Sequence, residues 1–326
     1  MSTARFLRLV DSHSQRFRPY GSLLAPATAL ALLLLLAGAA PAQTKPAAKP
    51  KIPRPEEQEW ETRDGVILKA TFFPGTRGKD TVPIILLHGY EGSRNDYAGL
   101  ARYLQAEGHA VIVPDFRGHG GSVEVKNDTR KLKASTMPGT QFERMVTVDM
   151  EKVKSFLMEK NNGGELNIEK LCVVGSQMGA VIAMEWALRD WSWPQLPRLK
   201  QGQDVKALVL ISPEWSFRTL KVGNLFKNPH IAGSLSVLII DGDKSRSAAD
   251  ARRIHTMFAR PRPKPKEPKD KDLFKIDRKT SLQGTKLLNE PAFRIDRLIE
   301  QFVKLRLVNQ SYPWTNRQSP LQKASP

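Results

Sequence analysis

One short stretch decides the fold of this chain: Val173-Val174-Gly175-Ser176-Gln177-Met178-Gly179-Ala180. The apolar run from Leu171 to Val174 is typical of a buried strand, and the residues after the stretch read as a helix. The strand therefore passes straight into the helix, and Gln177 lies midway between two glycines, Gly175 and Gly179, at the turn.

On both sides of this turn, short apolar runs alternate with helical patterns. The other runs, continuous as in strands buried on both faces, are Val66 to Phe73, Val82 to Leu87, Ala110 to Pro114, Ala207 to Ile211 and Ser236 to Ile240. One helix opens at Ser93, has Asp96 three residues on, and places an apolar set on one face: Tyr97, Leu100, Ala101 and Leu104. The alternation predicts an α/β fold with one mostly parallel central sheet and helices on both faces.

Three stretches at predicted strand ends together resemble the α/β-hydrolase fold family. They are Leu87-His88-Gly89-Tyr90, Asp115-Phe116-Arg117-Gly118-His119-Gly120-Gly121-Ser122, and the turn at Gln177, which is similar to the nucleophile elbow G-x-S-x-G. The resemblance extends from about Trp60 to Phe302. It implies that the backbone N–H groups of Tyr90 and Met178 would bind an oxyanion, and that Glu214 to Ser234 leaves room for a minimal cap only. It also implies that Gly175 and Gly179 are the elbow glycines, at a turn so tight that a Cβ at either would clash with neighbouring backbone, and that Gln177 between them adopts a φ angle above zero.

The resemblance also implies a triad of catalytic side chains, and all three positions are degenerate. Gln177 stands where the family has its serine, and a carboxamide has no ionisable nucleophilic atom. Ser245 stands at the position of the acid. Gln283 stands at the position of the histidine, in the loop after a last strand read as Leu273 to Ile276. Ordinary acyl-enzyme chemistry is therefore expected to be absent.

Other side chains near the predicted site leave a fallback open. Ser176 lies one position early and its side chain should point away from the mouth, while Asp243 is a carboxylate two residues before the acid position. His88 and His119 are also near the site. Family members with an intact triad carry histidine at both places, where it supports loop backbone, so the same role is expected here.

The N-terminal segment has the layout of an export signal. Arginines at 5, 8, 16 and 18 precede an apolar run from Ala27 to Ala40, and Ala40-Pro41-Ala42 fits a small-x-small cleavage site. An uncleaved signal anchor is the rival interpretation, since Leu23 to Ala40 is about long enough to span a bilayer. The predicted organisation is a signal over 1–42, a Pro/Lys-rich linker over 43–57, an α/β-hydrolase domain over 58–305 and a C-terminal tail over 306–326. The protein is expected to be periplasmic, envelope-associated or secreted, with membrane contact only if the signal is uncleaved.

Charge and composition limit the partners. The formal charge is +18, and removal of residues 1–42 takes away four Arg and one Asp, which leaves +15. This charge favours anionic partners, but much of it lies in irregular segments such as Arg260 to Lys279, which are expected to be solvated. Attraction to an envelope polyanion is the alternative. Nucleic acid is not expected, because aromatic residues are not interleaved with the charges. The histidines show no metal-ligand spacing and no glycine-rich phosphate loop is present, so neither metal nor cofactor is implied.

Three functions fit these patterns. The first is a non-catalytic exported pseudohydrolase that acts in binding or assembly, with a small carbonyl or carboxylate ligand in the old cleft. The second is an active ester or peptide hydrolase that uses off-pattern residues such as Ser176 with Asp243 or Glu214 and a histidine from another loop. The third is a basic envelope-binding protein whose fold merely carries the charged segments.

Overall fold

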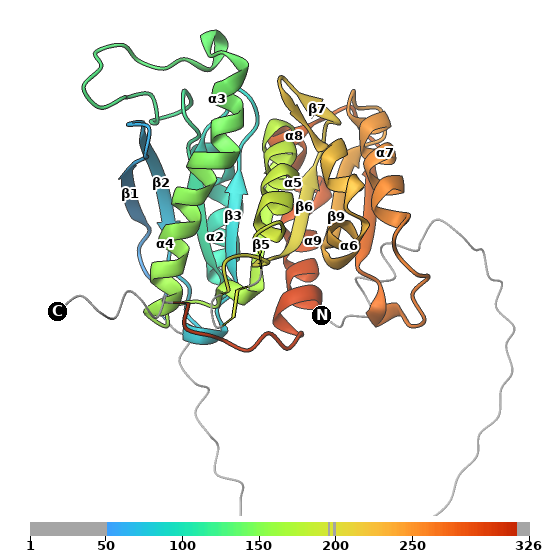
Figure 1. The fold of residues 1–326 in the computed structure, drawn as a ribbon. Coiled ribbons are helices and arrows are strands. Elements are labelled where there is room, and N and C mark those ends of the chain that lie inside the picture. Colours follow the sequence, from blue (N-terminus) through green and yellow to red (C-terminus); the bar gives the residue numbers. More distant parts are fainter. Residues whose placement is uncertain (1–50, 195, 198–199, 318–326) are drawn as a thin grey trace, which may run out of the picture.

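The computed structural model describes residues 51–194, 196–197 and 200–317. Eight strands form one sheet in the order β1-β2-β4-β3-β5-β6-β9-β10 (Figure 1). Strand β2 runs antiparallel to both of its neighbours, and all the other pairs are parallel. The predicted α/β fold with a mostly parallel sheet is thus confirmed. The export signal, the first part of the linker and residues 318–326 lie outside the described residues.

The elements follow the predicted alternation closely. The sheet strands are β1 (Glu56–Glu61), β2 (Ile67–Phe73), β3 (Pro83–Leu87), β4 (Ala110–Pro114), β5 (Leu171–Ser176), β6 (Val205–Ile211), β9 (Ser236–Gly242) and β10 (Leu273–Arg278), and β7 (Ser216–Phe217) pairs with β8 (Leu220–Lys221) in a separate hairpin. The helices are α2 (Ala98–Ala106), α3 (Gly139–Arg144), α4 (Met150–Asn162), α5 (Met178–Trp191), α6 (Pro229–Ser234), α7 (Ala248–Ala259), α8 (Gly284–Leu288) and α9 (Ile295–Val303). In the described part of the chain no helix combines the length and apolar character needed to cross a membrane.

Strand β1 is the one element of the sheet that the sequence patterns missed. It begins at Glu56, two residues before the predicted start of the domain. Its sequence is EEQEWE, in which only Trp60 is apolar, and it pairs antiparallel with β2 at the edge of the sheet. An edge strand needs no apolar run because it is not buried on both faces, so the hydrophobic pattern carries no signal for it.

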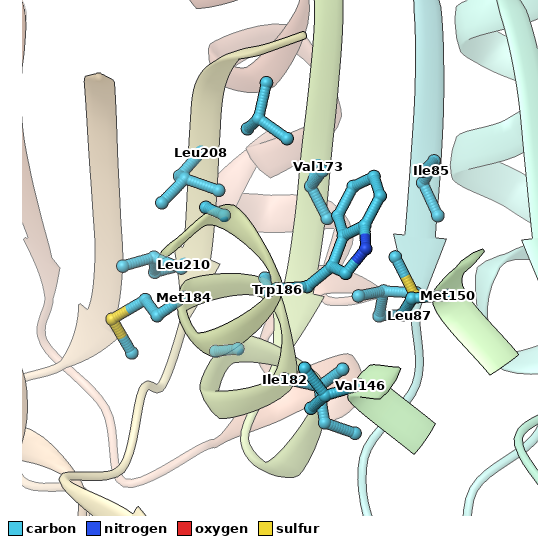
Figure 2. Packing of buried hydrophobic residues seen from close by; sticks show 14 of the residues in the cluster. Ile85, Leu87, Val146, Met150, Val173, Ile182, Met184, Trp186, Leu208 and Leu210 are labelled. Carbon is cyan, nitrogen blue, oxygen red and sulfur yellow. The ribbon is translucent and has the colours of Figure 1, made fainter. Parts of the chain in front are cut away.

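Two apolar clusters cover the two faces of the sheet. One packs α4, α5 and α7 on the sheet, and Figure 2 shows the indole of Trp186 from α5 among Ile85, Val173 and Met150. The other packs α2 and α9 on the opposite face and contains the predicted set Tyr97, Leu100, Ala101 and Leu104. The Ser93–Asp96 capping box is present at the start of this segment, as the sequence predicts.

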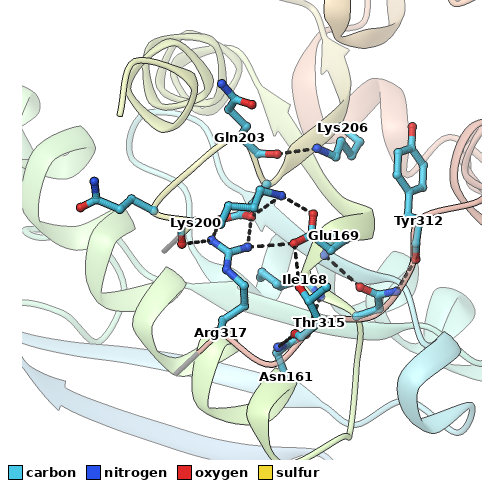
Figure 3. A network of polar contacts seen from close by, with 12 residues as sticks. Asn161, Ile168, Glu169, Lys200, Gln203, Lys206, Tyr312, Thr315 and Arg317 are labelled. Atoms are coloured by element: carbon cyan, nitrogen blue, oxygen red, sulfur yellow. Dashed lines mark hydrogen bonds and ion pairs between the residues drawn. The ribbon is translucent and has the colours of Figure 1, made fainter. Parts of the chain in front are cut away.

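The segment after α9 packs against the domain. A π-helical turn, Lys304–Val308, is followed by an extended segment whose Arg317 is only 8% exposed. Its guanidinium forms ion pairs with Asp204 and, at 3.1 Å, with Glu169, and Figure 3 shows the contact with Glu169 beside Lys200. Glu169 and Asp204 precede β5 and β6, so residues 309–317 of the predicted tail dock at the amino ends of the parallel strands.

Candidate functional site

The site lies where the carboxyl ends of the parallel strands meet. The strand order β4-β3-β5 places a topological switch point between β3 and β5, which is where open α/β sheets form their crevice. Leu87 of β3 is level with Gly175 of β5 in the register of the sheet. The turn after β3 and the turn after β5 therefore face each other.

Gln177 occupies a strained turn between β5 and α5. Its φ and ψ angles are 48° and −115°, as expected for the elbow and unfavourable for any residue with a Cβ. Its backbone N–H donates to the carbonyl oxygen of Ile211 at 3.0 Å, which ties the turn to the end of β6. Such strain, of order 1–3 kcal/mol, persists only where the surrounding structure enforces it.

The two elbow glycines permit the close approach of helix and sheet. A Cβ at Gly179 would lie 2.6 Å from the carbonyl oxygen of His88, and a Cβ at Gly175 would lie 2.6 Å from the backbone nitrogen of Ala180. Real Cβ atoms do not approach backbone so closely. The N-terminus of α5 can therefore sit against the end of β3 only because both residues are glycine.

The side chain of Gln177 lies between two other glycines. A Cβ at Gly89 would be 3.0 Å from its Oε1 atom, and a Cβ at Gly284 would be 2.5 Å from the same atom. Gly89 belongs to the turn after β3, and Gly284 follows Gln283 at the start of α8. The structure thus brings the nucleophile position against both the oxyanion turn and the loop of the histidine position, while Gln177 itself stays partly exposed.

The acid position holds a hydroxyl, and a different carboxylate is buried beneath it. Ser245 Oγ donates to Oδ1 of Asp241 at 2.9 Å, and the Ser212 and Ser247 hydroxyls donate to the same carboxylate. Asp241 is fully buried. Asp243, the carboxylate that the sequence singled out, is exposed and accepts the backbone N–H of Thr280 at 3.1 Å.

Ser212 links this carboxylate to the loop that faces Gln177. It follows β6 with φ 48°, is fully buried, and accepts the backbone N–H of Gly284 at 3.0 Å. Sequence reasoning missed both Ser212 and Asp241. The only sequence signal for these two residues is that each is polar and directly follows a buried apolar run. A sequence pattern does not say which of several such residues will meet in the folded protein.

Gln283 lies beside the loop of the acid position. In the orientation that satisfies its amide, Oε1 accepts the backbone N–H of Arg246 at 2.6 Å and that of Ser247 at 3.1 Å. The three positions predicted for the triad are therefore neighbours in the structure, through backbone and side-chain contacts. Each carries a neutral group, which can accept or donate a hydrogen bond but cannot relay a proton as a histidine does.

The two histidines near the site are engaged with the backbone. His88 is buried, with Nδ1 donating to Gly89 O at 2.8 Å and Nε2 accepting from the N–H of Phe116 at 3.1 Å. Burial lowers the pKa of His88 to about 4, so its ring is neutral at pH 7. His119 donates from Nδ1 to Arg117 O at 3.0 Å, and burial lowers its pKa as well.

Ser176 is fully buried on the far side of β5 from the elbow side chain. Strand alternation places it on the same face as Cys172 and Val174, which belong to the cluster under α2 and α9. Burial also raises the pKa of the Cys172 thiol. Neither side chain reaches the crevice in this structure.

Two backbone donors at the elbow remain unused. Among the hydrogen bonds within residues 51–194, 196–197 and 200–317, none has the N–H of Tyr90 or of Met178 as its donor. Met178 opens the 14-residue helix α5, whose dipole adds partial positive charge at this point. In the same described ranges, no three His, Cys, Asp or Glu side chains gather as metal ligands would.

Comparisons with known proteins agree with this architecture. A sequence model of the alpha/beta hydrolase fold matches residues 82–230. An uncharacterized protein of Mycobacterium tuberculosis is 25% identical over 144 residues, which cover 44% of this chain and 45% of that protein. The sn-1-specific diacylglycerol lipase ABHD11 of Danio rerio is 29% identical over 110 residues, 33% of this chain and 28% of the lipase. The chain thus matches less than half the length of these relatives.

Solved esterase structures share the fold over most of the chain. The esterase Pf2001 of Pyrococcus furiosus superposes with a TM-score of 0.52 at 17% identity, over 78% of this chain and 92% of the esterase. An esterase of Rhizomucor miehei superposes with a TM-score of 0.53 at 15% identity, over 79% and 85% of the two chains. Together with the sheet order and the elbow at Gln177, these matches show that the chain has the α/β-hydrolase fold.

Proposed function

We propose that this protein is an exported, non-catalytic α/β-hydrolase-fold protein that binds a small carbonyl or carboxylate ligand in its crevice. The observation that carries the proposal is the elbow itself. Gln177 keeps the strained φ of 48° although its side chain has no nucleophilic atom. Strain at a cleft is usually retained where the geometry has a use.

The contacts of the residues at the predicted triad positions support the absence of catalysis. Gln283 accepts two backbone N–H groups, and Ser245 donates its hydroxyl to Asp241. The off-pattern route would need Ser176, which is fully buried on the other face of β5. His88 is not available as a general base, because both of its ring nitrogens already bond to backbone.

The retained feature is a pair of free backbone donors. The N–H groups of Tyr90 and Met178 lie on the two turns that face each other across Gln177, at the N-terminus of α5. Such donors bind an oxyanion during acyl transfer in active relatives of the fold. With no nucleophile in reach, the same donors would hold a carboxylate or carbonyl oxygen without any covalent step.

A probe for activated serine tests the first half of this proposal. The mature chain, residues 43–326, should show no labelling by a fluorophosphonate and no turnover of short p-nitrophenyl esters. The Ser176→Ala variant is the matched control. Turnover by the wild type above that control would favour the alternative of an active hydrolase. Gln177→Ser alone should also stay inactive, because a serine without a base remains protonated.

Selective amide labelling tests the second half. The sequence has only 5 Tyr and 8 Met, so ¹⁵N labelling of these two types gives a sparse spectrum. Titration with acetate or acetamide should shift the Tyr90 and Met178 signals to saturation, and ethanol, which lacks a carbonyl, should not. If the Tyr90 and Met178 signals do not move even at the highest acetate and acetamide concentrations, binding at the elbow is refuted.

Export rests on the N-terminal sequence pattern and is tested by processing. Expression of the full chain in a bacterium should yield a periplasmic or secreted product whose N-terminus is Gln43. Retention in the membrane at full length would indicate the signal anchor instead. An envelope polyanion as partner is tested by binding of the mature chain to anionic cell-wall polymer, which should weaken steeply with salt.

A further inference from the structure

Three aromatic rings from distant parts of the chain meet beside the elbow. They form what we name the aromatic platform: Tyr90 after β3, Phe142 of α3 and Phe217 of β7. Ring centroids are 5.4 Å apart for Tyr90 and Phe217, 5.5 Å for Phe142 and Phe217, and 6.4 Å for Tyr90 and Phe142. Tyr90 is also one of the two residues whose N–H group is free at the elbow.

One arginine lies over all three rings. The guanidinium carbon of Arg218 is 5.6 Å from the Tyr90 ring centroid, 5.9 Å from that of Phe142 and 6.0 Å from that of Phe217. These distances are in the range of cation–π contacts. Arg218 is thus held at a defined place beside the crevice.

The hairpin that carries Arg218 is anchored. Arg218 sits in the turn between β7 and β8 with φ 53°, a conformation that residues with a Cβ adopt only under constraint. The next residue, Thr219, donates its hydroxyl to the carbonyl oxygen of Gly139 at 3.0 Å, which fastens the hairpin to α3. The position of Arg218 is therefore fixed by the β7–β8 hairpin and by the attachment of this hairpin to α3.

The guanidinium has no carboxylate partner in the described part of the chain. Arg218 is exposed, and none of the ion pairs or side-chain hydrogen bonds among the described residues involves it. Its five N–H donors remain available, because ring faces attract the charge without accepting those hydrogens strongly. The exposed Glu91 follows Tyr90 in the chain, and its charge acts on the pKa of His119.

We infer that Arg218 is the residue that makes the crevice selective for carboxylates over neutral carbonyl compounds. This inference rests on the proposed function and narrows its ligand class. Tyr90 connects the two parts: its ring lies under the guanidinium, and its backbone belongs to the turn after β3, which lies against Gln177. A planar guanidinium binds a carboxylate through two parallel hydrogen bonds, which a neutral amide of the same shape cannot match.

The test compares two ligands that differ in charge. Phenylacetate and phenylacetamide are titrated into the mature protein, with the Tyr90 and Met178 amide signals as the readout. Wild-type protein should bind phenylacetate about tenfold more tightly than phenylacetamide, as expected for one charge-assisted contact near solvent. That preference should shrink when NaCl is raised, because the contact is exposed.

The variants separate charge from packing. Arg218→Gln should bring the ratio of the two affinities close to one while leaving the affinity for phenylacetamide unchanged. Arg102→Gln removes an equal charge from the exposed surface of α2 and should leave the ratio as in the wild type. Glu91→Gln removes the negative charge next to Tyr90 in the chain. Because that charge repels an anionic ligand, the variant should bind phenylacetate about twofold more tightly.

The outcomes are distinguishable. If both ligands bind with equal affinity and Arg218→Gln changes neither, the inference is wrong and the proposed function stands. If Arg218→Gln weakens both ligands by the same factor, Arg218 only supports the platform, and the inference is again wrong. If neither ligand moves the Tyr90 and Met178 signals, the proposed function fails and the inference with it.

Discussion

The contact between Gln177 and Gly284 gives a stability prediction that can be worked from the geometry. Gly284 has φ 55°, and a Cβ placed there would lie 2.5 Å from Oε1 and 2.9 Å from Cδ of Gln177. Gly284→Ala therefore combines two costs. Left-handed backbone costs a residue with a Cβ about 1–2 kcal/mol, and overpacking against the amide adds about 1–3 kcal/mol. We expect the free energy of unfolding to fall by roughly 2–5 kcal/mol in total.

A double-mutant cycle isolates the second cost. Gln177→Ala keeps the Cβ and the backbone strain but removes the atoms that a Cβ at Gly284 would meet. In that background Gly284→Ala should cost only the backbone share, about 1–2 kcal/mol, so the coupling energy should be about 1–3 kcal/mol. The assay is urea unfolding followed by tryptophan fluorescence. The slope of the free energy of unfolding against urea concentration should be the same for all variants.

Gly78→Ala is the matched control for the same experiment. Gly78 has φ 53°, and the nearest atom that its Cβ would meet is Gly164 O at 3.6 Å, an ordinary contact. Gly78→Ala should therefore lower the free energy of unfolding only by the cost of left-handed backbone, about 1–2 kcal/mol. Equal losses at Gly78 and Gly284, or a coupling below about 0.5 kcal/mol, would refute the placement of the Gln177 side chain against Gly284.

Three further predictions use the buried polar groups. Asp241→Ala removes the acceptor of the Ser212, Ser245 and Ser247 hydroxyls, so urea unfolding should show a loss of about 2–4 kcal/mol, and an effect below 1 kcal/mol would contradict the network. Arg317→Ala removes one of the cations that pair with Asp204 and Glu169, while Lys154 and Lys200 remain, so a loss of about 2 kcal/mol is expected, whereas Lys264→Ala on the exposed surface should cost almost nothing. Burial lowers the pKa of His88 to about 4 and that of His109 to about 3, so the unfolded state binds more protons as the pH falls below 6.5. The free energy of unfolding should therefore decrease between pH 6.5 and pH 4, by up to about 1.4 kcal/mol per pH unit for each histidine, and a flat profile would contradict the neutral buried rings.

The sequence by itself determined the elements whose signals are local. Apolar runs predict β3, β4, β5, β6 and β9 because a strand buried on both faces must be apolar throughout. Gly175 and Gly179 mark the elbow because only glycine tolerates backbone at that distance, and the positive φ of Gln177 follows from the same crowding. The capping box at Ser93 was equally readable, since its two residues stand three apart in the chain.

Only the tertiary structure decided which distant residues converge at the crevice. Ser212 follows β6, Asp241 lies near the end of β9 and Gly284 begins α8, and their hydrogen-bonded chain exists because β6 and β9 are neighbours in the sheet. The same holds for Arg218 over Tyr90, which depends on how a two-strand hairpin packs against the turn after β3. Local patterns encode burial and backbone conformation, whereas the partner of a polar side chain is set by the packing of elements far apart in the chain.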